Sequence, residues 1–288
     1  MDHKYVYPCL APANKDYGFF RVSGPGLANC MILAAKSYCI AKRLNAQLVE
    51  PTWFKFSIGP YLRREKDKRH YFRVFKSSGI SGLRKLTILL QKSEYNDDNL
   101  SVFAVATNGI CRISKMRKLF QDIDPYYTKE YFDSIITDKT KESVEGTNFE
   151  KTVAVHVRLG DFNAQQRTHI QWFVNMIRKF SSINPELKYL IFSDGTDEEI
   201  SQLLAMENVS RASFGRQAIS DIYAISKCSI VIASNSTFSA MGAFWGQKPI
   251  IFQEREFGAI FPDSPENELV IKDNNLPEAW CNKIKVCQ

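Results

Sequence analysis

Three side chains that could bind or transform a phosphate ester lie close together in the sequence TVAVHVRLGD, residues 152–161 of this 288-residue chain. The β-branched residues of this stretch predict a buried strand, and His156, Arg158 and Asp161 stand at its C-terminal end. Ligands of open α/β sheets bind at the carboxyl ends of the strands. An arginine followed by Gly160, which lets the backbone turn, suits a phosphate or diphosphate. The alternative is a solvated strand end in which Arg158 pairs with Asp161.

The C-terminal half has the pattern of a parallel sheet. Strand-like runs at 152–158, 189–194, 209–214, 229–234 and 248–253 alternate with helix-like segments, such as 168–181 and 217–228. This alternation predicts βαβ units and therefore an α/β fold. Most of these strands end in polar or small residues, Asp194 among them. Since the ends of parallel strands share one edge of the sheet, a nucleotide-type site is expected there.

A second signal follows the fourth of these strands. Ser236, Thr237 and Phe238 begin a helix-like stretch, and hydroxyl groups at a helix start can cap free backbone N–H groups. The same N–H groups, helped by the helix dipole, can bind an anion. Arg158 and the Ser236–Thr237 turn are therefore candidates for holding a diphosphate between them. Helix capping without a ligand is the alternative.

A glycine-containing loop marks the N-terminal half. FFRV at 19–22 predicts a strand, SGPGLAN at 23–29 a loop, and the apolar spacing from Leu27 onward a helix that ends near Arg43. A short strand, QLV, follows the helix. This order is Rossmann-like, although the loop is not a GxGxxG dinucleotide motif. Gly26 allows the backbone to approach a ligand closely, and a plain tight turn is the alternative.

Composition is typical of a globular protein, with 24% charged and 44% hydrophobic residues. The length suffices for two domains. No apolar run of about 18 residues and no signal-peptide pattern are present, so we expect no transmembrane segment. The seven cysteines form no CxxC pair, which favours free thiols and a cytoplasmic location.

A basic segment from Arg63 to Lys85 interleaves nine cationic residues with Tyr71, Phe72 and Phe75. It predicts an insertion at 57–100. One interpretation is a solvated, partly helical insertion. Another is an acceptor-binding surface, for example for a lipid-diphosphate-linked glycan, with the protein peripheral at a membrane. The net charge of +7 is modest and no RNA or DNA motif accompanies it, so no nucleic-acid partner is expected.

Asp122 and Asp124 form a DxD pair, which binds metal in some enzymes. They stand immediately before Pro125 and a helix-like segment. Acidic residues at a helix start are ordinary caps, and the sequence identifies no third ligand. We therefore expect a helix cap, and neither a metal nor another cofactor.

Four blocks of the sequence together resemble GDP-fucose-dependent fucosyltransferases, in particular the α-1,2-fucosyltransferases of glycosyltransferase family 11. GPGLANCM followed by PTW is similar to the first block of these enzymes, and HVRLGD resembles their HxRRGD motif. IFSD at 191–194 matches an intermediate block. The long run DIYAISKCSIVIASNSTFSAMGAF resembles the third motif of the family. The blocks occur in family order and span residues 24–245.

The resemblance implies a GT-B fold, with two Rossmann-like domains facing across a cleft. The domains would comprise residues 1–145 on the acceptor side and 146–288 on the donor side. The implied enzyme is an inverting, metal-independent fucosyltransferase that moves L-fucose from GDP-fucose to a glycan hydroxyl, most naturally in α-1,2 linkage to a galactoside.

The resemblance also implies roles for individual residues. Arg158 would contact the β-phosphate, His156 and Asp221 would recognise guanosine, and Ser236, Thr237 and Phe238 would hold the diphosphate. Asp194 joins this donor set, while Gly26 and Asn29 would face the reaction centre. Asp161 is a candidate catalytic base, or alternatively orients Arg158.

Four residues at three places depart from the family pattern. Leu159 replaces the second arginine, Ala240-Met241 replaces a tandem tryptophan, and Cys30 replaces a glutamine. Two alternative functions therefore stay open. One is a glycosyltransferase that uses another GDP-sugar, and the other is a glycan- or nucleotide-binding protein that has lost catalysis.

Overall fold

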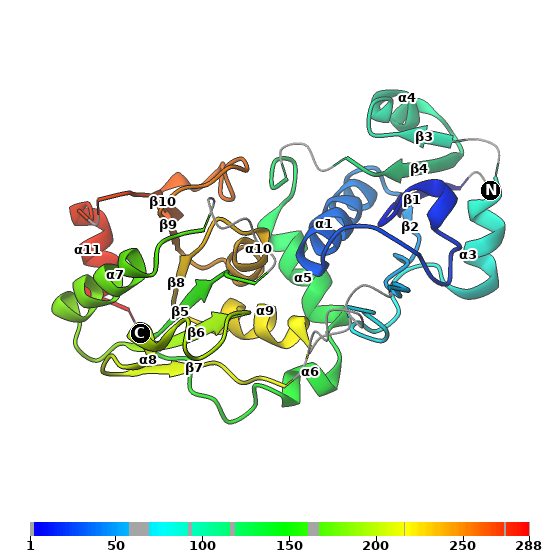
Figure 1. Ribbon diagram of the computed structural model, residues 1–288. Coiled ribbons are helices and arrows are strands. Elements are labelled where there is room, and N and C mark those ends of the chain that lie inside the picture. Colours follow the sequence, from blue (N-terminus) through cyan, green and yellow to red (C-terminus); the bar gives the residue numbers. More distant parts are fainter. Residues whose placement is uncertain are drawn as a thin grey trace. The chain divides into compact units, whose positions relative to one another are not determined.

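The computed structural model describes residues 3–57, 69–91, 94–115, 119–160, 167–215, 217–273 and 275–287. The chain divides into two compact units, Met1–Glu142 (unit 1) and Ser143–Gln288 (unit 2). Each unit contains a parallel sheet with helices beside it (Figure 1), so the chain has the predicted α/β class. None of the helices in these ranges combines the length and apolar character needed to span a membrane.

Unit 1 is built on a four-stranded parallel sheet with the order β2-β1-β4-β3. Its elements are, in chain order, β1 (Lys4–Pro8), the 3-10 helix η1 (Ala13–Lys15), α1 (Leu27–Arg43), β2 (Gln47–Leu48), α3 (Gly82–Leu89), β3 (Glu94–Asn96), α4 (Leu100–Val105), β4 (Gly109–Ile113), α5 (Pro125–Ile135) and α6 (Asp138–Glu142). The helix predicted from Leu27 and the short strand after it are confirmed.

The strand predicted at 19–22 is wrong. The first strand of the sheet is β1, and the 19–22 segment makes only isolated bridges through Arg21. The guanidinium of Arg21 is fully buried and donates to the carbonyl groups of Thr52, Leu10 and Ser23. The Arg21 side chain therefore anchors this segment to the interior of unit 1. Apolar side chains and the hydrogen bonds of a regular strand do not.

Unit 2 is built on a six-stranded parallel sheet with the order β10-β9-β8-β5-β6-β7. Its elements are β5 (Thr152–Val157), α7 (Ile170–Ile183), β6 (Lys188–Ser193), α8 (Ser201–Leu204), β7 (Val209–Arg211), α9 (Ala218–Lys227), β8 (Ile230–Ala233), α10 (Thr237–Gly246), β9 (Ile250–Phe252), the 3-10 helix η3 (Pro265–Asn267), β10 (Glu268–Val270) and α11 (Glu278–Lys285). The five predicted strands are present, although β7 is shorter than expected, and β10 was not predicted.

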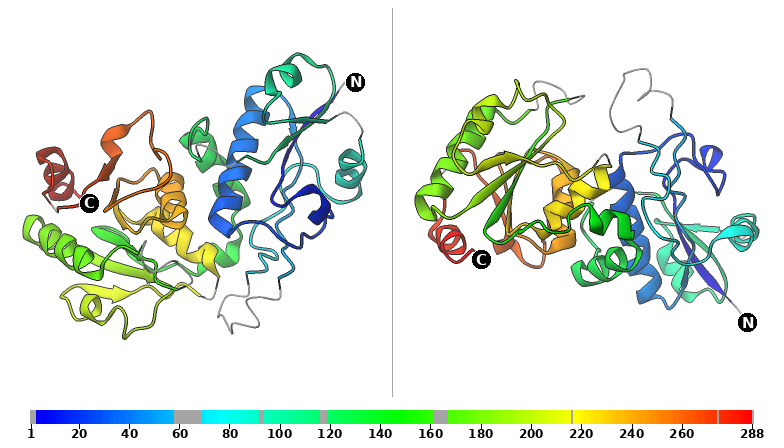
Figure 2. Two further views of the ribbon diagram at one scale, coloured as in Figure 1. Left: turned by 45° about the horizontal axis from the view of Figure 1, so that its top comes forward. Right: turned by 90° about the horizontal axis from the view of Figure 1, so that it is seen from below.

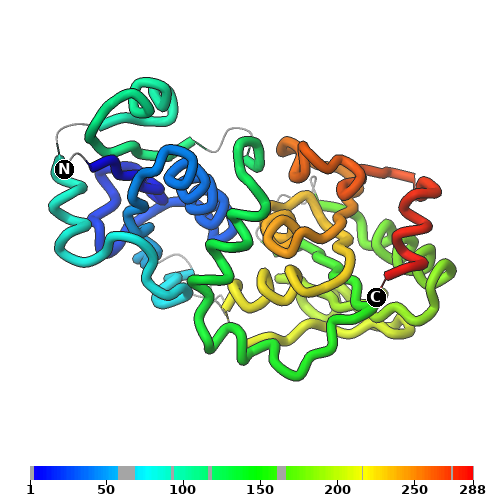
Figure 3. The backbone as a smooth tube through the Cα atoms, turned by 180° about the vertical axis from the view of Figure 1, so that it is seen from behind, coloured from blue at the N-terminus to red at the C-terminus, as the bar shows by residue number. Residues whose placement is uncertain are grey.

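Alternation along β5 divides its side chains between the two faces of the sheet. Val153, Val155 and Val157 belong to a buried cluster with α7 and α11, two helices that lie against each other (Figure 2). Since successive strand residues point to opposite faces, His156 points to the other face. There it meets α10, which lies beside α9 (Figure 3).

Two glycines of α10 allow it to pack closely against α9. A Cβ atom at Gly246 would lie 2.1 Å from the carbonyl oxygen of Ser226, and one at Gly242 would lie 2.6 Å from Cγ2 of Ile225. The helix is also apolar on nearly every side, because seven of its ten residues are buried. This contact fixes the position of the α10 N-terminus relative to the sheet.

We predict that Gly246→Ala destabilises the protein by about 1–3 kcal/mol, because the added methyl group meets a carbonyl oxygen that can move only with its helix. Urea unfolding measures the effect. Gly258→Ala is a matched control, because no atom lies within 4 Å of the added methyl group there. Equal stability of the two variants would contradict the proposed packing constraint.

Candidate functional site

The candidate site lies where β5, β6 and β8 end side by side. Parallel registers pair His156 with Phe192 of β6 and with Ala233 of β8. The residues that follow these strands therefore meet at one edge of the sheet, as the sequence predicted. Arg158, Asp194 and Ser234 all emerge at this edge.

His156 is a buried, neutral imidazole. Its Nδ1 atom lies 3.0 Å from Oγ of Ser239, and its ring stacks on Phe238 with the ring centroids 5.2 Å apart. Burial lowers the pKa of His156 to about 4; the nearby Arg158 adds to this decrease, while Asp194 opposes it. The imidazole is therefore uncharged at neutral pH.

The hydrogen bonds around His156 also indicate its tautomer. Ser239 Oγ donates to the carbonyl of Ser236 at 3.3 Å, so its single proton is used there. With the hydroxyl proton placed on that carbonyl, Nδ1 of His156 is assigned as the donor to Ser239. This assignment leaves Nε2 as a hydrogen-bond acceptor.

The chain leaving β5 is tied to the chain leaving β8. The backbone N–H of Arg158 donates to Oγ of Ser234 at 3.0 Å, and the N–H of Ser234 donates to the carbonyl of His156 at 2.9 Å. Ser234 is buried and Arg158 half-buried. The backbone from which the guanidinium projects is therefore held in place.

Asp194 fixes the next part of the same loop. Its Oδ1 atom accepts from the N–H of Leu159 at 2.8 Å and from that of Gly160 at 3.1 Å. A Cβ atom at residue 160 would lie 2.7 Å from Oδ2 of Asp194, so glycine permits this close approach. The contacts that Asp194 makes in the described residues thus position the Arg158 loop. Its predicted contact with a GDP-sugar stays a prediction.

Ser236 caps α10, which leaves open the prediction that this turn also holds a diphosphate. It is the N-cap residue, and its hydroxyl accepts from the N–H of Phe238 at 3.2 Å. Thr237 is the first helical residue, and Thr237 and Phe238 are half-buried. The N-terminus of a ten-residue helix therefore opens at the same edge as Arg158, next to the stacked His156.

Asp221 lies in the first turn of α9. Other residues of the third motif serve packing. The Ser226 hydroxyl donates to the carbonyl of Tyr223 at 2.6 Å, and Cys228 is fully buried. Such residues explain much of the length of this motif without any contact to a ligand.

The departures from the family pattern in unit 2 are interior positions. Leu159 is part of the apolar cluster with α7, and Ala240 and Met241 are fully buried in α10. Each of these side chains therefore contributes to packing in unit 2.

In unit 1 the predicted residues surround the start of α1. Gly26 is the N-cap, and the N–H of Leu27 donates to the hydroxyl of Tyr71 at 3.1 Å. Oδ1 of Asn29 is buried and makes no hydrogen bond within the described residues. Cys30 is buried, and its sulfur accepts from Arg21 at 3.2 Å.

Two cations that the sequence reading missed hold this glycine loop. Arg21 donates to the carbonyl of Ser23 at 2.6 Å, and Lys55 donates to that of Gly24 at 3.0 Å. Gly24 has a φ of +111°, and a Cβ atom there would lie 2.0 Å from the carbonyl oxygen of Leu10. No motif marks Arg21 or Lys55 in the sequence.

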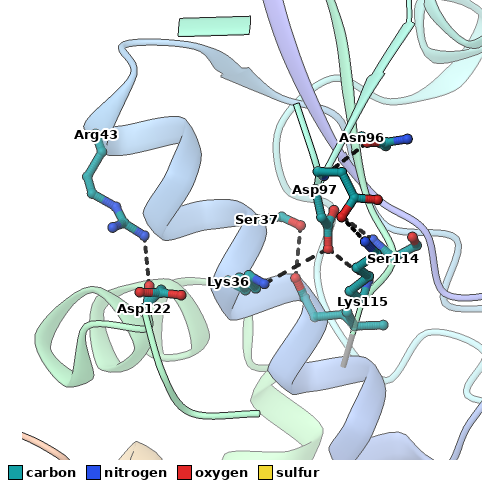
Figure 4. Close-up of polar contacts among 10 residues, drawn as sticks. Lys36, Ser37, Arg43, Asn96, Asp97, Ser114, Lys115 and Asp122 are labelled. Carbon is teal, nitrogen blue, oxygen red and sulfur yellow. Dashed lines mark hydrogen bonds and ion pairs between the residues drawn. The ribbon is translucent and has the colours of Figure 1, made fainter. Parts of the chain in front are cut away.

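Asp124 is a helix cap, as predicted. Its carboxylate accepts from the N–H groups of Tyr126 and Tyr127 at the start of α5, while the carbonyl of Asp122 accepts from Arg43 (Figure 4). The described residues contain no group of three or more His, Cys, Asp or Glu side chains arranged to hold a metal ion. Asp161, the candidate base, lies outside the described residues.

The fold, with its two parallel-sheet units, is that of a GT-B-like glycosyltransferase. The structure is similar to that of NodZ alpha-1,6-fucosyltransferase soaked with GDP-fucose, with 14% identity, a TM-score of 0.56, and coverage of 86% of this chain and 94% of NodZ. It is also similar to fucosyltransferase NodZ from Bradyrhizobium, with 13% identity, a TM-score of 0.55, and coverage of 87% and 96%.

The sequence identifies the family directly. The model described as Glycosyl transferase family 11 matches residues 92–253, and the chain belongs to this family of fucosyltransferases. No curated protein matches the sequence. The resemblance read from the motifs is therefore confirmed.

We predict that Asp194→Ala destabilises the protein by about 0.5–1.5 kcal/mol, because the part-buried N–H of Leu159 loses its acceptor. Asp194→Asn retains an acceptor oxygen and should lose less. Urea unfolding provides the measurement. Asp197→Ala is the control, since Asp197 pairs with Arg211 at an exposed position nearby. Identical midpoints for Asp194→Ala and the control would refute the role of Asp194.

The depressed pKa of His156 predicts a pH dependence of stability. The folded-state pKa of about 4 lies below the ordinary value of 6.5, so the unfolded chain binds the proton first as the pH falls. Stability is complete above about pH 6.5 and decreases toward pH 4. Between pH 7 and pH 5, the free energy of unfolding of His156→Gln should decrease by about 2 kcal/mol less than that of the native protein. The measurement is denaturant titration at several pH values. If the native protein and His156→Gln lose stability equally as the pH falls, the prediction is contradicted.

Proposed function

We propose that this protein transfers L-fucose from GDP-fucose to a glycan hydroxyl with inversion at the anomeric carbon. The observation that carries the proposal is the joint position of Arg158, the neutral His156 and the α10 N-terminus at one sheet edge. The guanidinium of Arg158 and the N–H groups at the start of α10 can bind a diphosphate. The ring nitrogen of His156 can accept a hydrogen bond from a nucleobase.

Guanine recognition is assigned to His156 and Asp221. Guanine presents an N1–H and an exocyclic amino group, both of them donors. The Nε2 lone pair of the neutral His156 and the Asp221 carboxylate are complementary acceptors. Uracil has one N–H beside two carbonyl groups and therefore matches two acceptors less well.

The chemistry requires stabilisation of a leaving group. Cleavage of the bond between fucose C1 and the phosphate oxygen leaves negative charge on the GDP β-phosphate. Arg158 and the amides beside Ser236 and Thr237 stabilise this charge, with Phe238 flanking them. The acceptor oxygen attacks C1 from the opposite face, and its proton passes to a base or to water. Asp161 is proposed as that base or as the residue that orients Arg158.

The same arrangement supports transfer without a metal ion, because a fixed guanidinium can neutralise the leaving diphosphate. Asp194 is proposed to serve the donor through the loop that it holds. Gly26 and Asn29 are assigned to the reaction centre. Residues 1–142 would serve the acceptor and residues 143–288 the donor.

We propose an α-1,2 linkage to a galactoside as the product, on the basis of the family-11 motifs. The similar NodZ enzyme is named as an alpha-1,6-fucosyltransferase, so product linkage analysis distinguishes the two. Seven free thiols are consistent with a cytoplasmic location. A lipid-linked glycan is the proposed acceptor class.

Donor selectivity tests the proposal. GDP should bind at least roughly tenfold more tightly than UDP by calorimetry, because UDP would leave an acceptor of the site unpaired. GDP-fucose should be hydrolysed faster than GDP-mannose, with and without EDTA. Equal affinity for UDP would overturn the guanine assignment, and activity that is lost in EDTA and restored by manganese would overturn metal independence.

Arg158→Lys should reduce kcat/KM by a factor corresponding to roughly 2–4 kcal/mol, because lysine keeps the charge but loses the forked donor geometry. Donor hydrolysis and transfer assays provide the measurement. Arg178→Lys is the control, since Arg178 is exposed on α7. Native kcat/KM in Arg158→Lys would show that Arg158 has only a structural role.

A further inference from the structure

Two extended segments of unit 1 run side by side around Arg21 and Lys55. These residues form a parallel β-bridge. The N–H of Arg21 donates to the carbonyl of Phe54 at 2.9 Å, and the N–H of Phe56 donates to the carbonyl of Arg21 at 2.7 Å. A third segment joins them, because the N–H of Lys55 donates to the carbonyl of His70 at 2.7 Å.

Charged and aromatic side chains lie on opposite sides of the bridged segments. Side chains of bridged residues point to the same side, and their chain neighbours point to the opposite side. Arg21 and Lys55 both point inward, where they bond the carbonyls of Ser23 and Gly24. The neighbours Phe20, Val22, Phe54 and Phe56 therefore share the outward side.

Further aromatic rings extend this outward side. Tyr17 stacks on Phe20 with centroids 4.8 Å apart, and Phe72 packs against Phe54 at 5.4 Å. We define the aromatic face as the exposed side chains Tyr17 (53%), Phe19 (59%), Phe20 (37%), Val22 (45%), Phe56 (50%) and Phe72 (57%). In the described part of unit 2, by contrast, the exposed large hydrophobic residues are Val270 and Val286. Exposed apolar side chains gathered on neighbouring segments in this way mark an interaction surface.

The charge around the aromatic face is positive. Lys15 and Arg73 are exposed beside it, and the Arg73 guanidinium lies 5.1 Å from the ring centre of Phe72. The described ranges 9–24, 52–57 and 69–76 contain one acidic residue, Asp16. Its carboxylate already accepts from the Tyr7 hydroxyl and from the N–H of Gly18.

We propose that the aromatic face docks this protein on an anionic lipid membrane. Phenylalanine side chains gain free energy on entering the acyl boundary, and nearby cations are attracted to anionic headgroups. A sugar-binding surface needs polar groups for the hydroxyls of its ligand, whereas four of the six side chains here are phenylalanine. This docking is independent of the proposed reaction, because it involves no residue assigned to the donor site.

Vesicle flotation of the full chain tests the proposal. The native protein should bind vesicles of phosphatidylcholine with phosphatidylglycerol more strongly than vesicles of phosphatidylcholine alone, and added salt should weaken the binding. Phe20→Ser/Phe72→Ser should lower the partition coefficient by roughly tenfold or more, since two apolar contacts are lost. Arg73→Glu should lower it on anionic vesicles and less on neutral ones.

The matched control is Leu90→Ser/Val105→Ser, which removes two exposed apolar side chains of unit 1 at 82% and 83% exposure. It should bind vesicles like the native protein, and all variants should retain the native urea midpoint and GDP affinity. The proposal is overturned if the native protein ignores both vesicle types, or if the two double variants bind equally. Self-association or binding of soluble oligosaccharide that is lost in Phe20→Ser/Phe72→Ser, without vesicle binding, would also overturn it. Absence of GDP binding would count against the proposed reaction and leave the vesicle result interpretable.

Discussion

The carboxylate of Asp194 is the contact on which the geometry of the candidate site depends. One oxygen accepts two consecutive N–H groups from the loop after β5, and that loop carries Arg158. An arginine side chain is long and flexible, so its position at a phosphate depends on a fixed backbone and on neighbouring contacts. The hydrogen bonds to Ser234 and Asp194 fix this backbone. Ser234 holds the N–H of Arg158, and Asp194 holds the two residues that follow it.

Unit 1 uses the same arrangement at its own sheet edge. Asp97 directly follows β3, and its carboxylate accepts from the N–H groups of Ser114 and Lys115, which follow the adjacent strand β4 (Figure 4). Lys36 of α1 lies 3.9 Å from the same carboxylate. In each unit an aspartate after one parallel strand therefore fixes the chain after its neighbour. A single aspartate within a βαβ pattern can thus have a structural role at the very edge where ligands are expected.

The sequence predicted the parts of the fold that repeat a regular pattern. Continuous β-branched runs identified β5 and β8, and apolar spacing identified α1 and α7. It failed at 19–22, where aromatic residues face outward and the buried group is the guanidinium of Arg21. Hydrophobicity patterns assume that apolar side chains are the buried ones, so this segment was misread. Strands β1, β3, β4 and β10 were not predicted; β3 and β10 have only three residues each, whereas β1 and β4, with five, were not recognised as strands.

The candidate site was predictable to the extent that strand ends are predictable. His156, Arg158 and Ser236 were found because a buried strand ended in polar groups, which cost free energy in an interior unless they are paired or used. The sequence placed Asp194 at this edge, but it did not predict which groups Asp194, Ser234 and Ser239 bond, because that depends on strand register and on the position of α10. The stack of His156 on Phe238 and its low pKa arise from burial that appears only when α10 is in place.

The third motif illustrates how chemistry and packing share one stretch of sequence. Ser236 and Thr237 stand at the helix start, whereas Gly242 and Gly246 stand about one and a half and two and a half turns further along and determine how closely α10 approaches α9. A side chain at Gly246 would meet the carbonyl oxygen of Ser226, so α10 could not keep its present approach to α9. The spacing between the hydroxyl residues and the glycines is therefore itself a requirement of the site. A motif can therefore include a glycine that serves only packing, because the position of the helix start depends on it.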